Sequence, residues 1–554
     1  MKKSGSELLF LPLGGAGEIG MNLYLYGYGG KWIMVDLGIT FRDESNPTVE
    51  VVMADPAFIS EQVENLEAIF LTHGHEDHLG AIPYLWDRFD CPVYATPFTA
   101  AFLRRKLLDD GVEYGRVKVR EVIPGGKSIK AGPFSVDYIH LTHSIPEPNA
   151  LVIKTPLGTI LHTGDYKFDP TPLIEDVADE AALKAVGDAG VLAMVGDSTN
   201  VFNPDCSGSE AECRQGLTEV IGKYDRRIAV TCFASNIARL ESIAKAAAAN
   251  GRRTALVGRS LWRMNDVARE CGYLKSVPAF LTEEEGAHLP VGKVVFICTG
   301  SQGEPNAALA RIAYDNHPHV AFGRGDVVIF SSRVIPGNEK AIIKVENQLA
   351  RLGVDAVTAA HHLVHVSGHP GRKEVERMYS LIRPRIAVPI HGESMHLLEH
   401  AHIAEMCGVP EVVVNENGGL VRLAPGPAEI VDRIPTGRLA KDGERLVRLD
   451  SQLMRDRKRT VYQGAAMVTV VLDDKDRIDG PPLVSAPGIL DDRDDRALLE
   501  VISEEVAEAI MRLKPKQRRE DEEVREAARV AVRRALFAQV HRKPVVAAHL
   551  IRIE

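Results

Sequence analysis

The sequence predicts an α/β protein: a sandwich of two sheets flanked by helices, a parallel α/β domain inserted into it, and a small C-terminal α/β domain. Short apolar strands in the N-terminal part end in loops rich in histidine and aspartate, which fits a sandwich with outer helices. Strands and helices then alternate, as in a parallel sheet covered on both faces. Residues 385–391 return to the first pattern, because this strand also ends in a histidine.

Composition is that of a multidomain globular protein in a reducing compartment. The 554 residues exceed the roughly 250–300 at which one core stops growing, and 45% hydrophobic and 26% charged residues are ordinary values. Seven scattered cysteines without paired spacing favour free thiols. Residues 8–13 are too short a run for a signal peptide, and no apolar run approaches the roughly 20 residues that span a bilayer. We expect a cytoplasmic protein without membrane contact.

The net charge of −10 supplies no overall excess of positive charge for a nucleic-acid partner. Aspartates that bind metal would contribute to this total, and the local field at a site matters more than the sum. Composition therefore leaves nucleic-acid binding open.

The first strands, residues 8–13 and 23–26, flank a glycine-rich loop at residues 14–20. A dinucleotide-binding loop would lead into a helix, and no helical pattern follows here. We interpret the glycines as letting the backbone approach a metal site. The next strand ends at Asp36.

Residues 73–78 read HGHEDH, so three histidines and an aspartate occupy six positions. The apolar run before them predicts a buried strand, with the cluster on the loop at its end and a helix starting at Leu79. Imidazole nitrogens and a carboxylate without cysteine suit zinc or a similar divalent ion. His73 and His75 can reach one ion from an extended loop, while Asp77 and His78 point at a second.

Domain boundaries follow from the change in pattern. We assign residues 1–205 and 365–435 to two parts of the first domain, residues 206–364 to the insertion, residues 436–457 to a linker, and residues 458–554 to the C-terminal α/β domain. In the last domain, one helix carries an apolar stripe that fits either the domain's own core or an assembly surface, formed by Leu499, Ile502, Val506, Ile510 and Leu513.

The HGHEDH segment resembles the H-x-H-x-D-H motif of the metallo-β-lactamase superfamily. The superfamily's other motifs follow in order: an aspartate after an early strand at Asp36, a lone histidine at His143, and a further aspartate at Asp165. This resemblance implies an αββα sandwich that binds divalent metal.

The insertion resembles the β-CASP arrangement of nucleases with this fold. Its motifs are matched by Asp197 in GDSTN, His369 in HVSGH and His391 in PIHGE. Three further stretches resemble the ribonuclease J family: residues 233–236, 299–305 and 335–339. Arg333 departs from the proline-rich approach expected before the last of these.

The resemblance implies two divalent ions per subunit, which we expect to be Zn²⁺. One ion is assigned to His73, His75, His143 and Asp165, and the other to Asp77, His78, Asp165 and His391, with Asp165 bridging. Asp36 is expected to orient a ligand histidine rather than to bind metal. Two such ions can activate water and hold a scissile phosphate in line. His369, with its tautomer held by Asp197, is expected to protonate the departing 3′ oxygen, so catalysis should depend on Asp77, His369 and Asp197.

Two segments are expected to bind substrate across a cleft: Phe233, Ala234 and Ser235 on one side, and His365, Val366, Ser367, Gly368 and His369 on the other. The small polar turn at residues 367–369 could hold a terminal phosphate. Arg239, Arg259 and Arg263 are candidate contacts to the RNA backbone, with ordinary surface charge as the alternative.

The implied function is that of a zinc-dependent ribonuclease with 5′-to-3′ exonuclease and endonuclease activity on single-stranded RNA. It would act on mRNA and rRNA precursors, in mRNA decay and rRNA 5′-end maturation, and favour 5′-monophosphate ends. The C-terminal domain would support a homodimer or homotetramer. The alternatives are a DNA-processing β-CASP nuclease, a metallo-hydrolase of small molecules and a non-catalytic RNA-binding protein. The ribonuclease J-like stretches argue against the DNA-processing nuclease, and the insertion argues against the small-molecule hydrolase. The complete ligand set argues against the non-catalytic protein.

Overall fold

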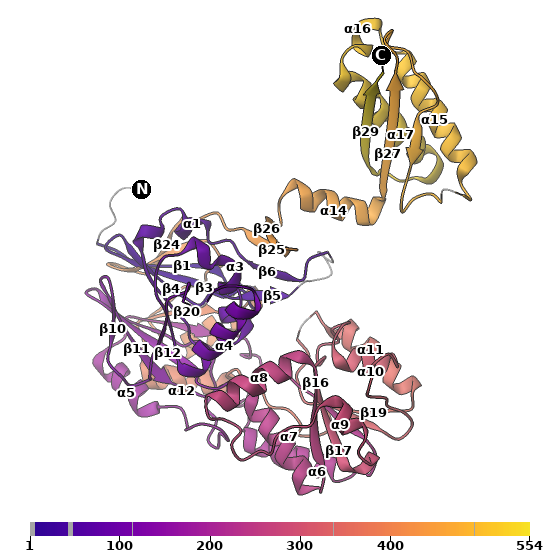
Figure 1. Cartoon of the computed structure of the whole chain (residues 1–554). Helices are drawn as coiled ribbons and strands as arrows, with labels where there is room; N and C mark the ends of the chain where they lie inside the picture. Colours follow the sequence, from indigo (N-terminus) through magenta and orange to yellow (C-terminus); the bar gives the residue numbers. More distant parts are fainter. Residues whose placement is uncertain (1–5, 42–47, 114, 336, 492, 554) are drawn as a thin grey trace. The chain divides into compact units, whose positions relative to one another are not determined.

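The computed structural model describes residues 6–41, 48–113, 115–335, 337–491 and 493–553 (Figure 1). Most residues up to Leu439 form one compact unit, and the residues from Ala440 onward form a second. The first unit contains two large sheets and a separate parallel sheet, and the second contains a small three-stranded sheet. This architecture confirms the predicted fold class.

Two sheets form the sandwich. The eight-stranded sheet has the order β24 (Glu429–Arg433), β23 (Gly419–Ala424), β1 (Leu8–Gly14), β3 (Leu23–Tyr28), β4 (Lys31–Val35), β7 (Leu66–Phe70), β8 (Val93–Ala95) and β9 (Val119–Glu121). The seven-stranded sheet has the order β10 (Ile129–Ala131), β11 (Phe134–His140), β12 (Asn149–Thr155), β13 (Gly158–His162), β14 (Ala193–Asp197), β20 (Ile386–Ile390) and β22 (Glu411–Val412). Strand β20 therefore joins a sheet whose other strands precede the insertion, apart from β22.

The main core lies between these sheets. Phe10, Ile33 and Phe70 from the first sheet share one apolar cluster with Leu151 and Val388 from the second. The central strands are buried along nearly their whole length, which is why they read as continuous apolar runs.

Parallel pairing brings the polar ends of distant strands to common edges. Strands β4 and β7 are parallel with Val35 opposite Phe70, so Asp36 and the histidine motif follow at the same end. Strands β13, β14 and β20 are also parallel, with Asp197 opposite Ile390. Asp165, Asp197 and His391 therefore emerge together although the chain between them contains the whole insertion.

Helices cover the outer face of the seven-stranded sheet. They are α5 (Glu180–Ala189), α12 (Arg372–Ile382) and α13 (Ser394–Met406). Leu183, Met378 and Ile403 from these helices share an apolar cluster with Val152 of β12. The other helices of this part are α1 (Ala57–Ser60), η1 (Val63–Asn65), α2 (Glu76–Leu79), α3 (Ile82–Leu85), η2 (Trp86–Arg88) and α4 (Pro97–Asp109).

Helix α2 starts three residues earlier than the helix predicted from Leu79 onward. Its first turn holds Glu76 and Asp77, acidic residues that suit a helix N-terminus but carry no apolar periodicity. Two short pairings complete this region: β2 (Ala16–Gly17) runs parallel to β21 (Gly392–Glu393), and β5 (Ile39–Phe41) runs antiparallel to β6 (Val51–Ala54).

The inserted sheet is parallel, with the order β16 (Arg253–Val257), β17 (Val294–Cys298), β15 (Ile228–Thr231), β18 (Val327–Phe330) and β19 (Asp355–Val357). Phe296 and Val328 are part of its own core. Its helices are α6 (Glu210–Ile221), α7 (Ile237–Ala249), α8 (Arg259–Glu270), α9 (Glu283–Ala287), η3 (Val291–Lys293), α10 (Ala308–Ala313) and α11 (Glu339–Arg351).

The range predicted as a linker contains β25 (Arg438–Asp442), β26 (Arg445–Arg448) and the start of α14 (Gln452–Gln463). The second unit continues with β27 (Ala465–Leu472), β28 (Leu483–Ser485), α15 (Arg496–Met511), α16 (Pro515–Arg518), α17 (Asp521–Val540) and β29 (Val545–Arg552). Ile502, Val506 and Ile510 are fully buried in the core of this unit. These members of the predicted stripe therefore serve the domain's own core. None of the helices in the described ranges has the length and apolarity to cross a membrane.

Candidate metal centre

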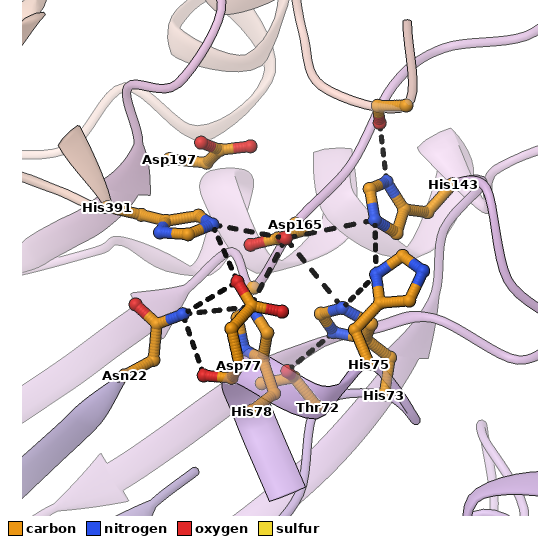
Figure 2. A network of polar contacts seen from close by, with 12 residues as sticks. Asn22, Thr72, His73, His75, Asp77, His78, His143, Asp165, Asp197 and His391 are labelled. Carbon is orange, nitrogen blue, oxygen red and sulfur yellow. Dashed lines mark hydrogen bonds and ion pairs between the residues drawn. The ribbon is translucent and has the colours of Figure 1, made fainter. Parts of the chain in front are cut away.

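The first predicted ligand group is assembled at the sheet edges (Figure 2). The ligand atoms of His73, His75, His143 and Asp165 all lie within 4.8 Å of one another. His75 Nδ1 is 3.1 Å from His73 Nε2 and 3.1 Å from His143 Nε2. Both Nε2 atoms are 3.7 Å from Asp165 Oδ2. Three imidazole nitrogens and one carboxylate oxygen therefore converge on one point.

The second predicted group lies beside the first and shares Asp165 with it. Asp77, His78, Asp165 and His391 again have ligand atoms within 4.8 Å of one another. Asp165 Oδ2 is 3.2 Å from His78 Nε2 and 3.3 Å from His391 Nε2. Asp77 Oδ2 is 3.5 Å and 3.6 Å from the same two nitrogens. Figure 2 shows Asp165 between the two groups of histidines.

The chemistry of these donors suits two divalent ions. Burial lowers the pKa of His73 and of His143 well below the usual value, and it lowers the pKa of His75 to about 4. These three rings are therefore neutral, which is the form that binds metal. Neutral imidazole with carboxylate and no thiolate is a donor set for zinc or a comparable ion. Which of these residues binds metal stays a prediction.

Asp36 lies behind the ligands. Its Oδ2 is 2.7 Å from His78 Nδ1 and accepts a hydrogen bond of 2.8 Å from Thr72 Oγ1, while Oδ1 accepts one of 2.8 Å from the Thr72 backbone N–H. This buried carboxylate fixes the ring nitrogen of His78 that faces away from the centre, and this contact is the one expected of a residue that orients a ligand. His143 has a similar partner, since its Nδ1 is 2.5 Å from the carbonyl oxygen of Gly368.

His369 and Asp197 form a pair at the edge of the centre. His369 Nδ1 is 2.9 Å from Asp197 Oδ2 and 3.7 Å from Asp165 Oδ2. Burial alone would lower the pKa of His369, but the charges of Asp197 and Asp165 raise it to about 9. Together with His391, these residues also form a third group whose ligand atoms lie within 4.8 Å of one another. The predicted acid and its orienting carboxylate are thus side by side.

The predicted substrate-binding residues lie at two places. Phe233, Ala234 and Ser235 are half-buried between β15 and α7. In the other segment, Ser367 Oγ accepts a hydrogen bond of 3.1 Å from the His369 backbone N–H, and Val366 is buried. The substrate contacts of both segments, including His365, stay predictions.

Arg239, a predicted contact to the RNA backbone, is not at the surface. Its side chain is fully buried and pairs with Glu210 at 2.8 Å, and its Nη1 lies 3.3 Å from His365 Nδ1. Arg263 pairs with Asp109 at 2.9 Å. Residue 239 was predicted to be a contact to the RNA backbone or an ordinary surface charge, but the inserted domain buries it against the segment that leads to His369.

Asn22 and Tyr24 are functional candidates that sequence reasoning did not assign. Asn22 Nδ2 donates to the Asp77 backbone oxygen at 3.0 Å and lies 3.0 Å from His78 Nε2. Tyr24 donates to Asn22 Oδ1 at 2.7 Å. Gly15 has a φ of +82°, and a side chain there would collide with Asn22 and Tyr24. The available signal was a pair of polar residues at the start of a buried strand directly after a glycine-rich loop.

The glycine-rich loop itself reaches the centre. The Gly15 carbonyl oxygen accepts a hydrogen bond of 2.6 Å from the His391 backbone N–H. His391 has a φ of +53° and Asp36 a φ of +60°, so two residues at the centre adopt backbone conformations that non-glycine residues rarely use.

Four family models match the chain. They are the metallo-beta-lactamase superfamily over residues 17–199, the ribonuclease J beta-CASP domain over residues 225–349, the Zn-dependent metallo-hydrolase RNA specificity domain over residues 354–412, and the ribonuclease J C-terminal domain over residues 452–553.

Similar curated proteins span nearly the whole chain. Ribonuclease J of Sinorhizobium meliloti is 44% identical, over 99% of this chain and 98% of that protein. Ribonuclease J of Thermus thermophilus is 36% identical, over 83% of this chain and 82% of that protein. Ribonuclease J2 of Bacillus subtilis is 32% identical, over 99% of both chains. A crystal structure of a protein of unknown function from Enterococcus faecalis V583 has a similar fold, with a TM-score of 0.53 and 18% identity over 75% of this chain and 100% of that one.

Proposed function

The chain belongs to the ribonuclease J family of metal-dependent RNA-cleaving hydrolases, and we propose that it cuts single-stranded RNA as a 5′-to-3′ exonuclease and as an endonuclease. The proposed substrates are mRNA and rRNA precursors, and the proposed roles are mRNA decay and rRNA 5′-end maturation in the cytoplasm. The seven cysteines, all free, agree with that reducing compartment.

One observation carries the catalytic part of this proposal: two groups of imidazole and carboxylate donors meet at Asp165. Four ligand atoms in each group suit two ions that share one bridging carboxylate. We propose that both ions are Zn²⁺. When bound, the ions would supply Lewis acidity at the scissile phosphate and lower the pKa of the attacking water.

The chain's own residues would position the reacting groups. Asp77 lies at the N-terminus of α2 and belongs to one ligand group. Its carboxylate accepts a hydrogen bond from the Asn22 amide, which fixes the direction of the carboxylate. Asp36 and Gly368 hold the rings of His78 and His143 from behind. Rotation of these ligands during turnover is thereby restricted, which keeps the reacting atoms in line.

His369 is the proposed proton donor to the departing 3′ oxygen. Its Nδ1 faces Asp197, so its Nε2 is the atom that can face the leaving group. Asn200 Nδ2 donates to the His369 backbone oxygen at 3.1 Å and fixes the main chain at this position. A positioned acid of this kind typically contributes about 10²–10⁴-fold to the rate.

The turn at residues 367–369 is the proposed 5′-phosphate site, with residues 233–235 as further substrate contacts. A terminal monophosphate held there lies at a fixed distance from the ions, while a triphosphate adds charge and length. We therefore expect exonuclease action to favour 5′-monophosphate ends. Internal cutting does not require an end in this site.

The test uses one RNA sequence with a 5′ monophosphate, triphosphate or hydroxyl, and the DNA version, each with and without chelator. We expect rapid, chelator-sensitive exonuclease action on the monophosphate RNA, slower action on the other RNA ends, and little on DNA. His75→Ala should be inactive but folded. Equal exonuclease rates on all three RNA ends would refute end selection. Preferential cutting of DNA would favour the DNA-processing alternative. Activity of metal-free His75→Ala would refute the metal mechanism.

A further inference from the structure

Arg333 is an exposed cation that plays no part in the mechanism above, and one residue links it to the main chain of the proposed proton donor. It follows β18 and two buried serines, Ser331 and Ser332. The main chain at Arg333 is fixed, because its carbonyl oxygen accepts a hydrogen bond of 2.9 Å from Gln302 Nε2. Its side chain therefore starts from a fixed backbone position.

The guanidinium is connected to the active site through one residue. Arg333 Nη1 donates to Asn200 Oδ1, and the amide nitrogen of the same side chain donates to the His369 carbonyl oxygen at 3.1 Å. Asn200 is 3% exposed, so both of its hydrogen bonds are held in a buried position. Arg333 is thus anchored at one nitrogen within two hydrogen bonds of His369.

Within the described ranges, Arg333 forms no ion pair, and its guanidinium donates only to Asn200. Two arginines of α12 behave differently: Arg372 pairs with Glu399, and Arg377 pairs with Glu180. An arginine has five N–H donors, and most of those on Arg333 remain free for a ligand.

The surrounding charge explains why a cation is useful here. Asp77, Asp165 and Asp197 are gathered at the centre, and a polyanionic substrate must approach them. Bound ions would offset part of that charge, and the guanidinium of Arg333 would attract the phosphates that the ions do not touch. Guanidinium groups pair with phosphate oxygens through two parallel hydrogen bonds.

We propose that Arg333 binds a phosphate group of the RNA on the inserted-domain side of the scissile bond. This inference rests on RNA being the substrate and adds a residue to its binding site. The phosphate is either internal or the 5′-terminal one, and the two share the same chemistry. Asn200 then has two roles, since it aims the guanidinium and holds the main chain of His369.

The test measures binding of a fluorescent RNA by the full chain, in an Asp77→Ala background that prevents cleavage, across a range of salt concentrations. Arg333→Gln removes the charge and keeps most of the side-chain volume. We expect about tenfold weaker binding and a salt slope smaller by about one. Arg351→Ala, which removes an exposed arginine from α11 of the same domain, is the control and should leave binding unchanged.

Two RNA forms separate the sources of the phosphate. Weaker binding of both 5′-hydroxyl and 5′-monophosphate RNA assigns an internal phosphate, and weaker binding of the monophosphate form alone assigns the terminal one. Unchanged binding and salt slope with both forms would overturn the proposal. Kinetics on the otherwise wild-type chain provide a second readout: a raised KM with near-normal kcat is expected for Arg333→Gln, whereas a fall in kcat alone would assign Arg333 to positioning His369 instead. Failure of the wild-type chain to cut RNA would count against the proposed function rather than against Arg333.

Discussion

At the residue scale, side chains outside the two proposed ligand groups hold the members of these groups in place. Asn22 is fully buried, and its amide nitrogen contacts both Asp77 and His78, which belong to the same proposed ligand group. Tyr24 fixes the amide from the other side by donating to Asn22 Oδ1. The direction of the Asp77 carboxylate is therefore set by the residue that precedes β3 as well as by α2.

We predict that Asn22→Ala weakens metal binding by about 10–100-fold, because partners of this kind typically contribute that much to affinity. Competition with a chromophoric chelator measures the affinity directly, without reference to activity. Asn65→Ala, which removes an asparagine whose amide contacts Glu64 at the surface, should bind metal like the wild type. Equal affinities in all three proteins would show that the Asn22 contact has no role in holding the ligands.

Sequence reasoning found the residues of the HGHEDH segment because their spacing alone brings them together. It did not find Asn22, whose partner Asp77 lies 55 positions away. That contact depends on the parallel pairing of β4 with β7, which brings α2 close to the start of β3, and the sequences of these two strands do not specify that pairing. The prediction for Arg239 was wrong because its burial likewise depends on a contact with a distant segment, residues 364–365.

At the element scale, α8 of the inserted domain is tied to the loop that follows His143. Tyr273, just after α8, lies 3.2 Å from a carboxylate oxygen of Glu147 and 3.2 Å from one of Glu175. Glu147 also accepts a hydrogen bond of 2.8 Å from Phe98 N at the start of α4. One hydroxyl proton cannot satisfy two charged carboxylates, so one of the pair is best protonated.

Burial, together with the charges of Glu147 and Asp176, raises the pKa of Glu175 to about 8, although hydrogen bonds from Glu147 N–H and Tyr273 oppose the shift. A folded-state pKa above the unfolded value of 4.5 means that the folded protein binds more protons between these two values. Stability should therefore fall as pH rises from about 4.5 to about 8 and level off above that.

We predict that Glu175→Gln loses much of this dependence and is more stable than the wild type at pH 8.5, by about 1–3 kcal/mol after allowance for partial solvent exposure. Thermal unfolding followed by circular dichroism between pH 5 and pH 9 measures the difference in stability between the two proteins. Glu61→Gln, at an exposed position, should track the wild type. Parallel pH curves for wild type and Glu175→Gln would mean that Glu175 stays ionised in the folded protein.

Element positions were predictable where periodicity was strong, as in the apolar strands β17 and β18 and in α7. Element positions were less predictable where polar residues form helices or strands, as in α2 and in strands β25 and β26 within the predicted linker. A charged, glycine-rich sequence predicts a linker, and such a segment forms strands only when it pairs with other strands.

At the scale of the whole molecule, the insertion was predictable because strand β20 ends in a histidine like the strands before it. What the sequence could not specify was that β14 and β20 are direct neighbours in one sheet, with Asp197 opposite Ile390. That pairing alone brings motifs 194 positions apart, at Asp197 and His391, into a single centre.

The second unit has an exposed apolar sheet face that its own core does not use. Residues of β27 alternate between buried and exposed, as in a sheet with one face on the core. Met467, Leu483 and Ile551 lie on the outer face with exposed fractions of 43%, 73% and 49%. Exposed apolar residues gathered on one face mark an interaction surface.

We predict that this face supports assembly of the homodimer or homotetramer. A chain truncated after Asp450 keeps the first compact unit, which ends at Leu439, and light scattering should show fewer subunits per particle than for the full chain. Leu483→Asp in the full chain should lower this number as well, because it places a charge in the contact, while Val501→Asp on α15 should not, although Val501 is also exposed. If truncation leaves the assembly state unchanged, the second unit is not its cause. If truncation lowers the number of subunits per particle but Leu483→Asp does not, the contact lies on another face of this unit.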